Sequence, residues 1–164
     1  MGVHLFEDLP KLMEQYSDQI VELTTMVVQK AALAGGDYLA RETPVDTGVA
    51  RSNWIMSVDA PVNSAIPAYV PYPTYRLSHR AGEADGFSRK SETANLDSVR
   101  VQHSSAASKF QADRNNAIYI TNNAPHIDLL NEGRSPQADA GFFDGSVDVA
   151  IKSIRGTWQL KEIP

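Results

Sequence analysis

Apolar residues recur every three or four positions between Leu9 and Ala40. The series is Leu9, Leu12, Tyr16, Ile20, Leu23, Val27, Ala31, Ala34 and Tyr38. This spacing predicts a long helix with one apolar stripe. Asp8 and Pro10 suit its start, because Asp caps free amides and proline tolerates the first turn. Pro44 disfavours helical geometry at Thr43, so the helix is expected to stop by Thr43.

Gly35 and Gly36 interrupt the end of this pattern. Two adjacent glycines cost about 2 kcal/mol of helix propensity relative to alanine. Their presence predicts either a bend or a close contact with another helix.

After Gly48 the apolar period changes from helical spacing to alternation. The alternation predicts a turn that leads into a strand, with Trp54, Met56 and Val58 facing the core. Pro61, Pro67, Pro71 and Pro73 then rule out a regular ladder or helix, and neither period persists to about Thr93. The stretch at about 60–93 is therefore predicted to be an extended arm or loop.

A weaker helical pattern begins past Ser91 and is expected to stop at Asn115 and Asn116. Its apolar face consists of Leu96, Val99, His103, Ala106 and Phe110. Residues 117–121 are rich in β-formers and run into the turn-prone Asn122, Asn123, Ala124 and Pro125, which predicts a second strand.

Ile127, Leu129 and Leu130 predict one or two helical turns closed by Gly133. A last helix is favoured from Phe142 towards Trp158. The elements together predict an α+β fold, in which the long N-terminal helix packs on a small antiparallel sheet, with shorter helices and the extended arm.

The composition of the chain excludes several kinds of functional site but adds little to the predicted fold. The chain has 164 residues and no cysteine, so one domain spanning 1–164 is expected and thiolate chemistry is excluded. The N-terminal residues have no signal-peptide or myristoylation pattern, and no apolar run approaches the roughly 20 residues of a membrane span. The net charge of −5 opposes DNA unless a basic patch acts locally.

Neither a metal site nor a cofactor site is predicted. The histidines are scattered, and none has an acidic or histidine partner three or four residues away on an evident helix face; they are His4, His79, His103 and His126. The acidic residues of the C-terminal third are expected to cap helices and face solvent; they are Asp128, Glu132, Asp139, Asp144 and Asp148.

Asp46, Thr47 and Gly48 form the tripeptide that carries the catalytic carboxylate of aspartic proteases. Such an enzyme needs two carboxylates, so a homodimer would have to supply the second. The tripeptide here follows a helix and Pro44 rather than an apolar strand. A structural corner explains the same residues: Asp46 caps backbone amides and Gly48 relieves backbone strain.

Two further residues fit the same corner. Arg51 is expected to reach the C-terminal carbonyls of the long helix, and Trp54 to be buried. The protease remains an alternative interpretation.

The same residues carry a family resemblance. A long helix followed by TPVDTG, an arginine-containing turn and a strand with an aromatic residue resembles the neck and tail-completion proteins of long-tailed bacteriophages. The stretch YITNNAPHIDLLNEGRSPQADAGFF resembles the second block of that family. The matching residues are Tyr119, Asn122, Asn123, Pro125, Leu130, Glu132, Gly133, Ser135, Gln137, Ala138 and Gly141. His126 and Asn131 depart from the pattern.

The resemblance implies a structural virion protein rather than an enzyme, assembled in the host cytoplasm and located at the head–tail junction. It implies a homo-oligomeric ring, with a hexamer and a dodecamer as candidates, that contacts other neck and tail proteins and lets DNA pass without specific binding.

The arm is expected to supply subunit contacts. Its aromatic and basic residues are typical of protein interfaces; they are Tyr69, Tyr72, Tyr75, Arg76, Arg80, Phe87, Arg89 and Lys90. The same residue types also suit single-stranded nucleic acid, so a nucleic-acid-binding module is a further alternative.

Overall fold

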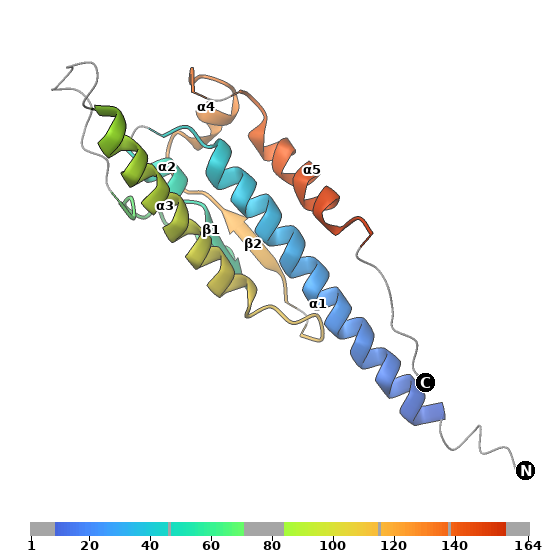
Figure 1. Ribbon diagram of the computed structural model, residues 1–164. Helices are drawn as coiled ribbons and strands as arrows, with labels where there is room; N and C mark the ends of the chain where they lie inside the picture. Colours follow the sequence, from blue (N-terminus) through green and yellow to red (C-terminus); the bar gives the residue numbers. More distant parts are fainter. Residues whose placement is uncertain (1–8, 46, 71–83, 115, 138, 157–164) are drawn as a thin grey trace, which may run out of the picture.

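A computed structural model describes residues 9–45, 47–70, 84–114, 116–137 and 139–156, and for residues 84–92 it describes the backbone only. The long helix α1 (Leu9–Glu42) lies between α3 (Ala84–Ala107) and α5 (Phe142–Ile154) (Figure 1). Of the two described strands, one contacts α3 and the other contacts α1. The predicted α+β class is confirmed.

Helix α1 spans Leu9–Glu42. It ends where the sequence indicates, because the backbone N–H and the hydroxyl of Thr43 both donate to the carbonyl oxygen of Leu39, at 3.1 and 2.6 Å. Among the described residues, its buried positions all lie in the C-terminal half, from Val27 onwards. The other half projects past the ends of α3 and α5 (Figure 1).

The sheet has two described strands, β1 at Ile55–Val58 and β2 at Ile118–Thr121, paired antiparallel with Met56 opposite Ile120. Trp54 and Met56 are buried as predicted, whereas Val58 is only half-buried. The alternation seen from Ala50 onwards is misleading at its start, because Val49–Ser52 forms a short helix, α2. Gly48 permits this turn with a φ of 80°.

Helix α3 spans Ala84–Ala107. The predicted arm is therefore wrong from residue 84 to 93, and the predicted helix end near Asn115 is also wrong. Once the packed half around Val99 is helical, propagation towards the N-terminus adds one hydrogen bond per residue. No proline lies in the sequence between Pro73 and Val99 to stop it. After Ala107 the helix gives way to a turn, in which the backbone N–H of Phe110 donates to the carbonyl oxygen of Ala107 at 3.0 Å.

Helices α4 (Ile127–Asn131) and α5 (Phe142–Ile154) confirm the two remaining predicted helices, although α5 ends at Ile154, before the end predicted towards Trp158. Gly133 ends α4 with a φ of 80°. The backbone N–H groups of Gly133 and Arg134 return to the carbonyl oxygens of Leu130 and Leu129, which is the Schellman pattern. Trp158, the last residue of the predicted C-terminal helix, lies outside the described residues.

The main core forms where α1, α2, α3 and α5 converge. Its buried members are Leu39, Ala40, Ala50, Trp54, Val99, Ala124, Ile127 and Phe142. Trp54 meets Phe143 edge-on, with ring centroids 5.6 Å apart. Helices are therefore held together around the corner that joins α1 to the sheet.

Gly35 and Gly36 mark close helix contacts, which confirms one of the two predicted alternatives. A Cβ atom at Gly36 would lie 2.7 Å from Nδ1 of His103 on α3. A Cβ atom at Gly35 would lie 3.3 Å from the carbonyl oxygen of Ser146 on α5. Each glycine thus lets a different helix approach α1.

Gly36→Ala is expected to lower the free energy of unfolding by about 1–3 kcal/mol, because the buried ring of His103 cannot move aside without repacking the core. Gly35→Ala is the matched control: the alanine gains about 1 kcal/mol of helix propensity against a milder contact, so its stability should stay close to wild type. Urea unfolding of both variants checks this. Equal losses would contradict it.

None of the helices in the described part of the chain is long and apolar enough to cross a membrane.

Candidate functional site

The corner between α1 and β1 is built around Thr43, which is 1% exposed. The hydroxyl of Thr43 accepts a hydrogen bond from Nε1 of Trp54 at 2.6 Å while it donates to the end of α1. One threonine thus fixes the largest core side chain relative to the helix terminus. Pro44 follows directly and forces the chain to leave the helix.

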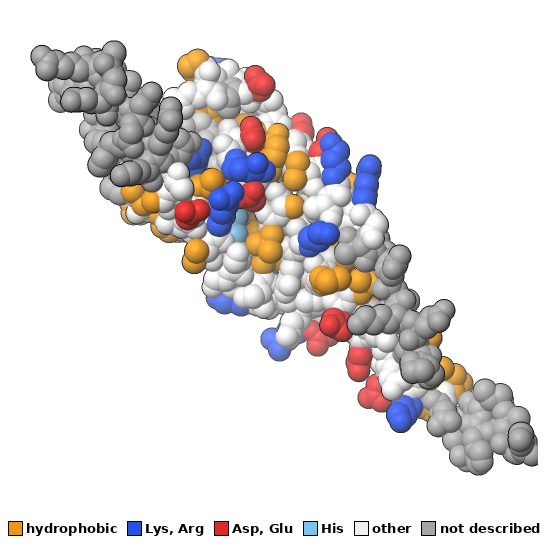
Figure 2. Space-filling model, viewed as in Figure 1, with side chains coloured by type: hydrophobic (Ala, Val, Ile, Leu, Met, Phe, Trp, Pro, Cys, Tyr) orange, Lys and Arg blue, Asp and Glu red, His pale blue; other side chains and the backbone are white. Residues whose placement is uncertain are grey.

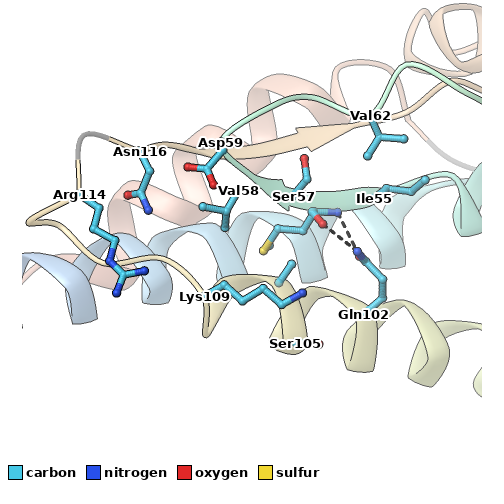
Figure 3. Close-up of a pocket in the computed structure, with 12 residues that line it drawn as sticks. Ile55, Ser57, Val58, Asp59, Val62, Gln102, Ser105, Lys109, Arg114 and Asn116 are labelled. Atoms are coloured by element: carbon cyan, nitrogen blue, oxygen red, sulfur yellow. Dashed lines mark hydrogen bonds between the residues drawn. The ribbon is translucent and has the colours of Figure 1, made fainter.

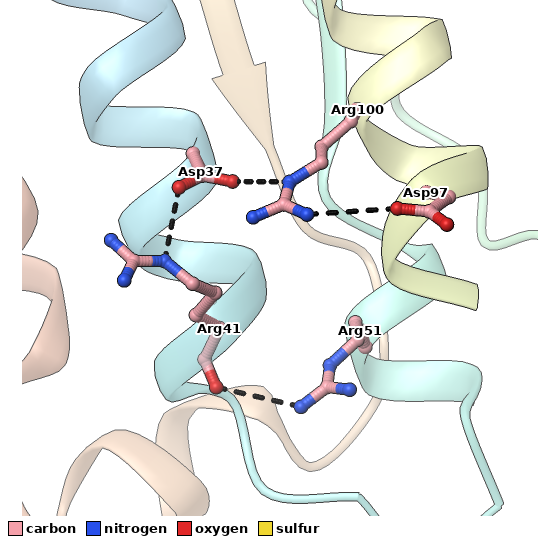
Figure 4. Close-up of polar contacts among 5 residues, drawn as sticks. All are labelled: Asp37, Arg41, Arg51, Asp97 and Arg100. Atoms are coloured by element: carbon pink, nitrogen blue, oxygen red, sulfur yellow. Dashed lines mark hydrogen bonds and ion pairs between the residues drawn. The ribbon is translucent and has the colours of Figure 1, made fainter. Parts of the chain in front are cut away.

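Arg51 lies on α2 and is 4% exposed. One of its terminal nitrogens donates to the carbonyl oxygens of Arg41 at 3.4 Å and Thr43 at 3.2 Å (Figure 4). The predicted contact with the C-terminal carbonyls of the long helix is confirmed. The positive charge also sits favourably at the negative end of the α1 dipole.

Thr47 and Gly48 lie between two helices, α1 and α2. The Thr47 hydroxyl accepts a long hydrogen bond of 3.5 Å from the backbone N–H of Val49, the first residue of α2. Asp46 lies outside the described residues, so its predicted capping role stays a prediction. The described part of the tripeptide follows a helix end, not the apolar strand on which an aspartic protease carries its carboxylate.

The second motif block packs onto this corner. The side-chain oxygen of Gln137 accepts from the backbone N–H of Val45 at 3.0 Å. The side-chain amide of Asn122 donates to the carbonyl oxygen of Ala50 at 2.8 Å, and its oxygen accepts from the N–H of Ala124 at 2.9 Å. The two blocks, which are distant in the sequence, therefore form one structural unit.

A small cavity of about 250 Å³ lies at this junction. Its lining joins residues of both blocks: Pro44, Val45, Thr47, Gly48, Ala50, His126, Leu130, Ser135 and Gln137. His126, which departs from the family pattern, thus faces the same cavity as the matching residues. No signal in the sequence could have shown that these positions surround a common space.

Asn131, the second departure from the pattern, connects α4 to α5. Its side-chain oxygen accepts from the N–H of Phe143 at 2.9 Å, and its carbonyl oxygen accepts from the N–H of Gly141 at 2.8 Å. It thereby satisfies amides at the start of α5, where Gly141 adopts a φ of 84°. Sequence reasoning treated this residue only as an interruption of the motif.

Other matching residues lie at the surface. Glu132 and Arg134 form an exposed ion pair of 3.1 Å, and Tyr119 is 36% exposed on β2. Ser135 accepts from the N–H of Gln137 at 3.2 Å. Pro125 follows the last β2 residues at the turn into α4. Ala138 lies outside the described residues.

The first part of the predicted arm, residues 60–70, is tied to the body. Asn53 exchanges two hydrogen bonds of 2.8 Å with the backbone of Ile66. Asn123 donates to the carbonyl oxygen of Val62 at 2.8 Å, and the N–H of Tyr69 donates to the hydroxyl of Ser52 at 3.0 Å. This segment follows the surface of its own subunit. Tyr69 stays 39% exposed, and its assignment to subunit contacts stays a prediction.

The remaining interface residues are only partly described. Tyr72, Tyr75, Arg76 and Arg80 lie outside the described residues. Phe87, Arg89 and Lys90 belong to the described backbone of α3, but their side chains are not described. Their assignment to subunit contacts stays a prediction.

A larger hollow of about 810 Å³ lies between β1 and the end of α3 (Figure 3). The Gln102 side chain points from α3 to the strand, where its amide donates to the carbonyl oxygen of Met56 at 2.7 Å and accepts from the Met56 N–H at 3.0 Å. Its carboxamide thus takes the place that a neighbouring strand would take. Lys109 and Arg114 line the far end of the hollow.

Ion pairs join α1 to α3 at the surface. Asp37 accepts from Nε of Arg41 at 3.0 Å and from Nε of Arg100 at 2.7 Å, and Arg100 also lies 3.6 Å from Asp97 (Figure 4). The hydrogen bond to Asp37 raises the pKa of Arg100. These side chains are exposed, so the pairs contribute little to stability.

His103 is the one buried histidine among the described residues, with 2% exposure. Its Nε2 lies 2.9 Å from the carbonyl oxygen of Trp54, which requires a proton on that nitrogen. Burial lowers the pKa of His103, although the bond to Trp54 and the charge of Asp37 oppose the shift. The ring is therefore neutral at pH 7 and acts as a packing residue.

Because the folded pKa of His103 lies below the unfolded value of 6.5, the unfolded chain binds the proton more tightly. Stability is therefore expected to fall as the pH drops below about 6.5. Urea unfolding at pH 7.5 and 5.5 measures this, with His103→Gln as the control that keeps a donor for Trp54 but does not titrate. An equal pH dependence in both proteins would contradict the assignment.

The described residues contain no group of three or more histidine, aspartate or glutamate side chains placed to hold a metal ion. Apart from His126, the residues that line the junction cavity are apolar or neutral and polar. Its chemistry suits packing and hydrogen bonding.

No protein-family model matches the chain, and neither curated proteins nor solved structures include one similar to it.

Proposed function

We propose that this protein is a structural component of a tailed-bacteriophage virion that forms a homo-oligomeric ring at the head–tail junction. One observation carries the proposal: the two motif blocks that resemble the neck and tail-completion family meet at one corner, through Val45 with Gln137 and Ala50 with Asn122. If the two short segments resembled the family only by chance, there would be no reason for them to be in contact. Their contact therefore supports the resemblance.

The surface is consistent with assembly. Large apolar side chains are exposed on the N-terminal half of α1, including Met13 at 65% and Ile20 at 51%. A closed ring buries such side chains through repeated contacts around a rotation axis. The buried side chains of the corner hold the helices in fixed relative positions, which a repeated contact needs.

Electron microscopy is the direct test. The purified protein is expected to form rings, and an antibody against it should label the junction between head and tail in virions of the phage that encodes it. A phage lacking the gene should accumulate unjoined heads and tails. Labelling elsewhere in the virion, or normal joining without the gene, would refute the proposal.

A variant separates this function from proteolysis. Asp46→Asn preserves capping capacity but removes the carboxylate, so it should leave ring formation and joining intact. Peptide cleavage by the wild type that Asp46→Asn abolishes would instead support the protease.

The protein is expected to pass through a DNA column at about 150 mM salt, because its net charge of −5 repels phosphates. A ring that guides DNA benefits from weak binding. Retention that depends on salt, and that is lost in Arg76→Ala/Arg80→Ala, would favour a nucleic-acid-binding module instead.

A further inference from the structure

The projecting half of α1, residues 9–26, carries apolar side chains that no described part of the chain covers. Leu9, Met13 and Tyr16 are 45%, 65% and 36% exposed, and Ile20 is 51% exposed. At 1.5 Å per residue this half is about 27 Å long. Single exposed apolar side chains are normal on a protein surface, but several in a row along one helix indicate an interaction surface.

The apolar side chains along this half follow a heptad that runs from four exposed residues through half-buried Leu23 to buried Val27. Leu9, Met13, Tyr16, Ile20, Leu23 and Val27 are separated by alternating steps of four and three. This is the spacing of the a and d positions in a coiled coil, with Met13, Ile20 and Val27 at a and the others at d. In the same helix Val27 is already buried, so the exposed seam continues an internal packing surface.

The charges of this half lie away from the seam. Lys11, Glu14, Asp18 and Glu22 occupy positions b, c and f, and the e and g positions hold Ser17, Thr24, Gln19, Leu12, Met26 and Pro10. Acidic side chains accordingly line the projecting half on the face seen in Figure 2. Like charges at e and g oppose the pairing of identical helices, and here none is present.

We infer that the projecting half of α1 packs in parallel against the same half of a second copy of this chain. A helical partner fits because the seam has helical spacing and lies on a helix that already packs against another helix, α5, further along. An identical partner fits because the flanking positions are uncharged. Within parallel coiled coils, a β-branched residue at a with leucine at d, as in Ile20 and Leu23, favours two strands over three or four.

This contact deepens the proposed function, on which its biological role rests, by specifying one contact between copies; because a parallel pair closes at two subunits, the ring needs a second, different contact. Its existence can be tested on the purified protein without reference to the virion.

The first test is Met13→Glu/Ile20→Glu, measured by analytical ultracentrifugation of the full chain. Both residues are exposed in the subunit, so folding is preserved, which circular dichroism checks. Facing carboxylates in the seam should raise the dissociation constant for self-association at least ~100-fold. The matched control is Val147→Glu/Ile151→Glu, an exposed apolar pair on α5 at 57% and 46%, which should associate as the wild type does.

The second test uses the absence of cysteine from the natural chain. Ile20→Cys should form a disulfide-linked dimer on oxidation, because equivalent a positions meet in a parallel pair. Asp18→Cys, on the opposite side of the helix, should not form this dimer.

Unchanged association of Met13→Glu/Ile20→Glu would overturn the inference, and rings that persist in that variant would leave the ring proposal standing. A monomeric wild type that associates only after deletion of residues 157–164 would show that the chain's own C-terminal segment covers the seam, which also overturns it. Association through the seam without rings or neck labelling would support the contact and refute the proposed virion function.

Discussion

Trp54→Ala is expected to lower the free energy of unfolding by about 3–5 kcal/mol, the largest single effect at the corner. Trp54 is 5% exposed, packs edge-on against Phe143, and donates its indole N–H to Thr43. The change removes the ring from the main core and leaves the Thr43 hydroxyl without that donor. Because domains are stable by only about 5–15 kcal/mol, a large part of the stability is lost.

Urea unfolding followed by far-ultraviolet circular dichroism measures the loss without relying on tryptophan fluorescence. Trp54→Phe is the matched control, since it keeps an aromatic ring beside Phe143 while it removes the indole N–H and only part of the buried ring volume. Its cost should be clearly smaller than that of the alanine variant. A loss below about 1 kcal/mol for Trp54→Ala would contradict the assigned core position.

Arg51→Ala is expected to cost about 2–4 kcal/mol, because it removes the donor to two carbonyl oxygens at the end of α1 and leaves a cavity. The guanidinium is buried, so water cannot easily replace it at the Thr43 carbonyl. The variant should also show faster hydrogen exchange of the backbone amides in α2, because Arg51 holds this helix against α1.

Arg41→Ala supplies the comparison within the same region. The Arg41 side chain is 49% exposed and pairs with Asp37 at 3.0 Å, so its loss should change stability by at most about 0.5 kcal/mol. Similar losses for Arg41→Ala and Arg51→Ala would mean that burial at Arg51 does not confer the stability assigned to it.

The sequence predicted those elements in which local signals and packing agree. The α1 stripe, the stop at Thr43, the Arg51 contact and the Gly133 cap each depend on spacing or on one residue's backbone chemistry. Such signals act over a few residues and are visible in the chain itself.

The errors lie where tertiary packing decides. Residues 84–93 lack an apolar period, yet they extend α3 because its other half is anchored in the core around Val99. Val49–Ser52 alternates like a strand, but Gly48 and Arg51 fix it as a helical turn against α1.

In the candidate site too, local features were predicted from the sequence and long-range contacts were not. Each motif block was apparent from the sequence, but their meeting through Gln137 and Asn122 was not, because nothing in either block specifies a partner so far along the chain. The structural role of Asn131 was missed because its partner, the backbone N–H of Phe143, lies 12 residues further along the chain and no local signal indicates that contact.

The carboxamide of Gln102 has a consequence for how copies of this protein can associate. The unpaired backbone groups of an exposed edge strand can pair with a strand of another chain, and repeated pairing of this kind produces aggregates of unlimited length. At Met56 both backbone groups on that edge are already occupied by Gln102. Uncontrolled polymerisation through β1 is thereby discouraged at this point, and association is directed to helical surfaces, whose geometry can close on itself and set a finite number of subunits.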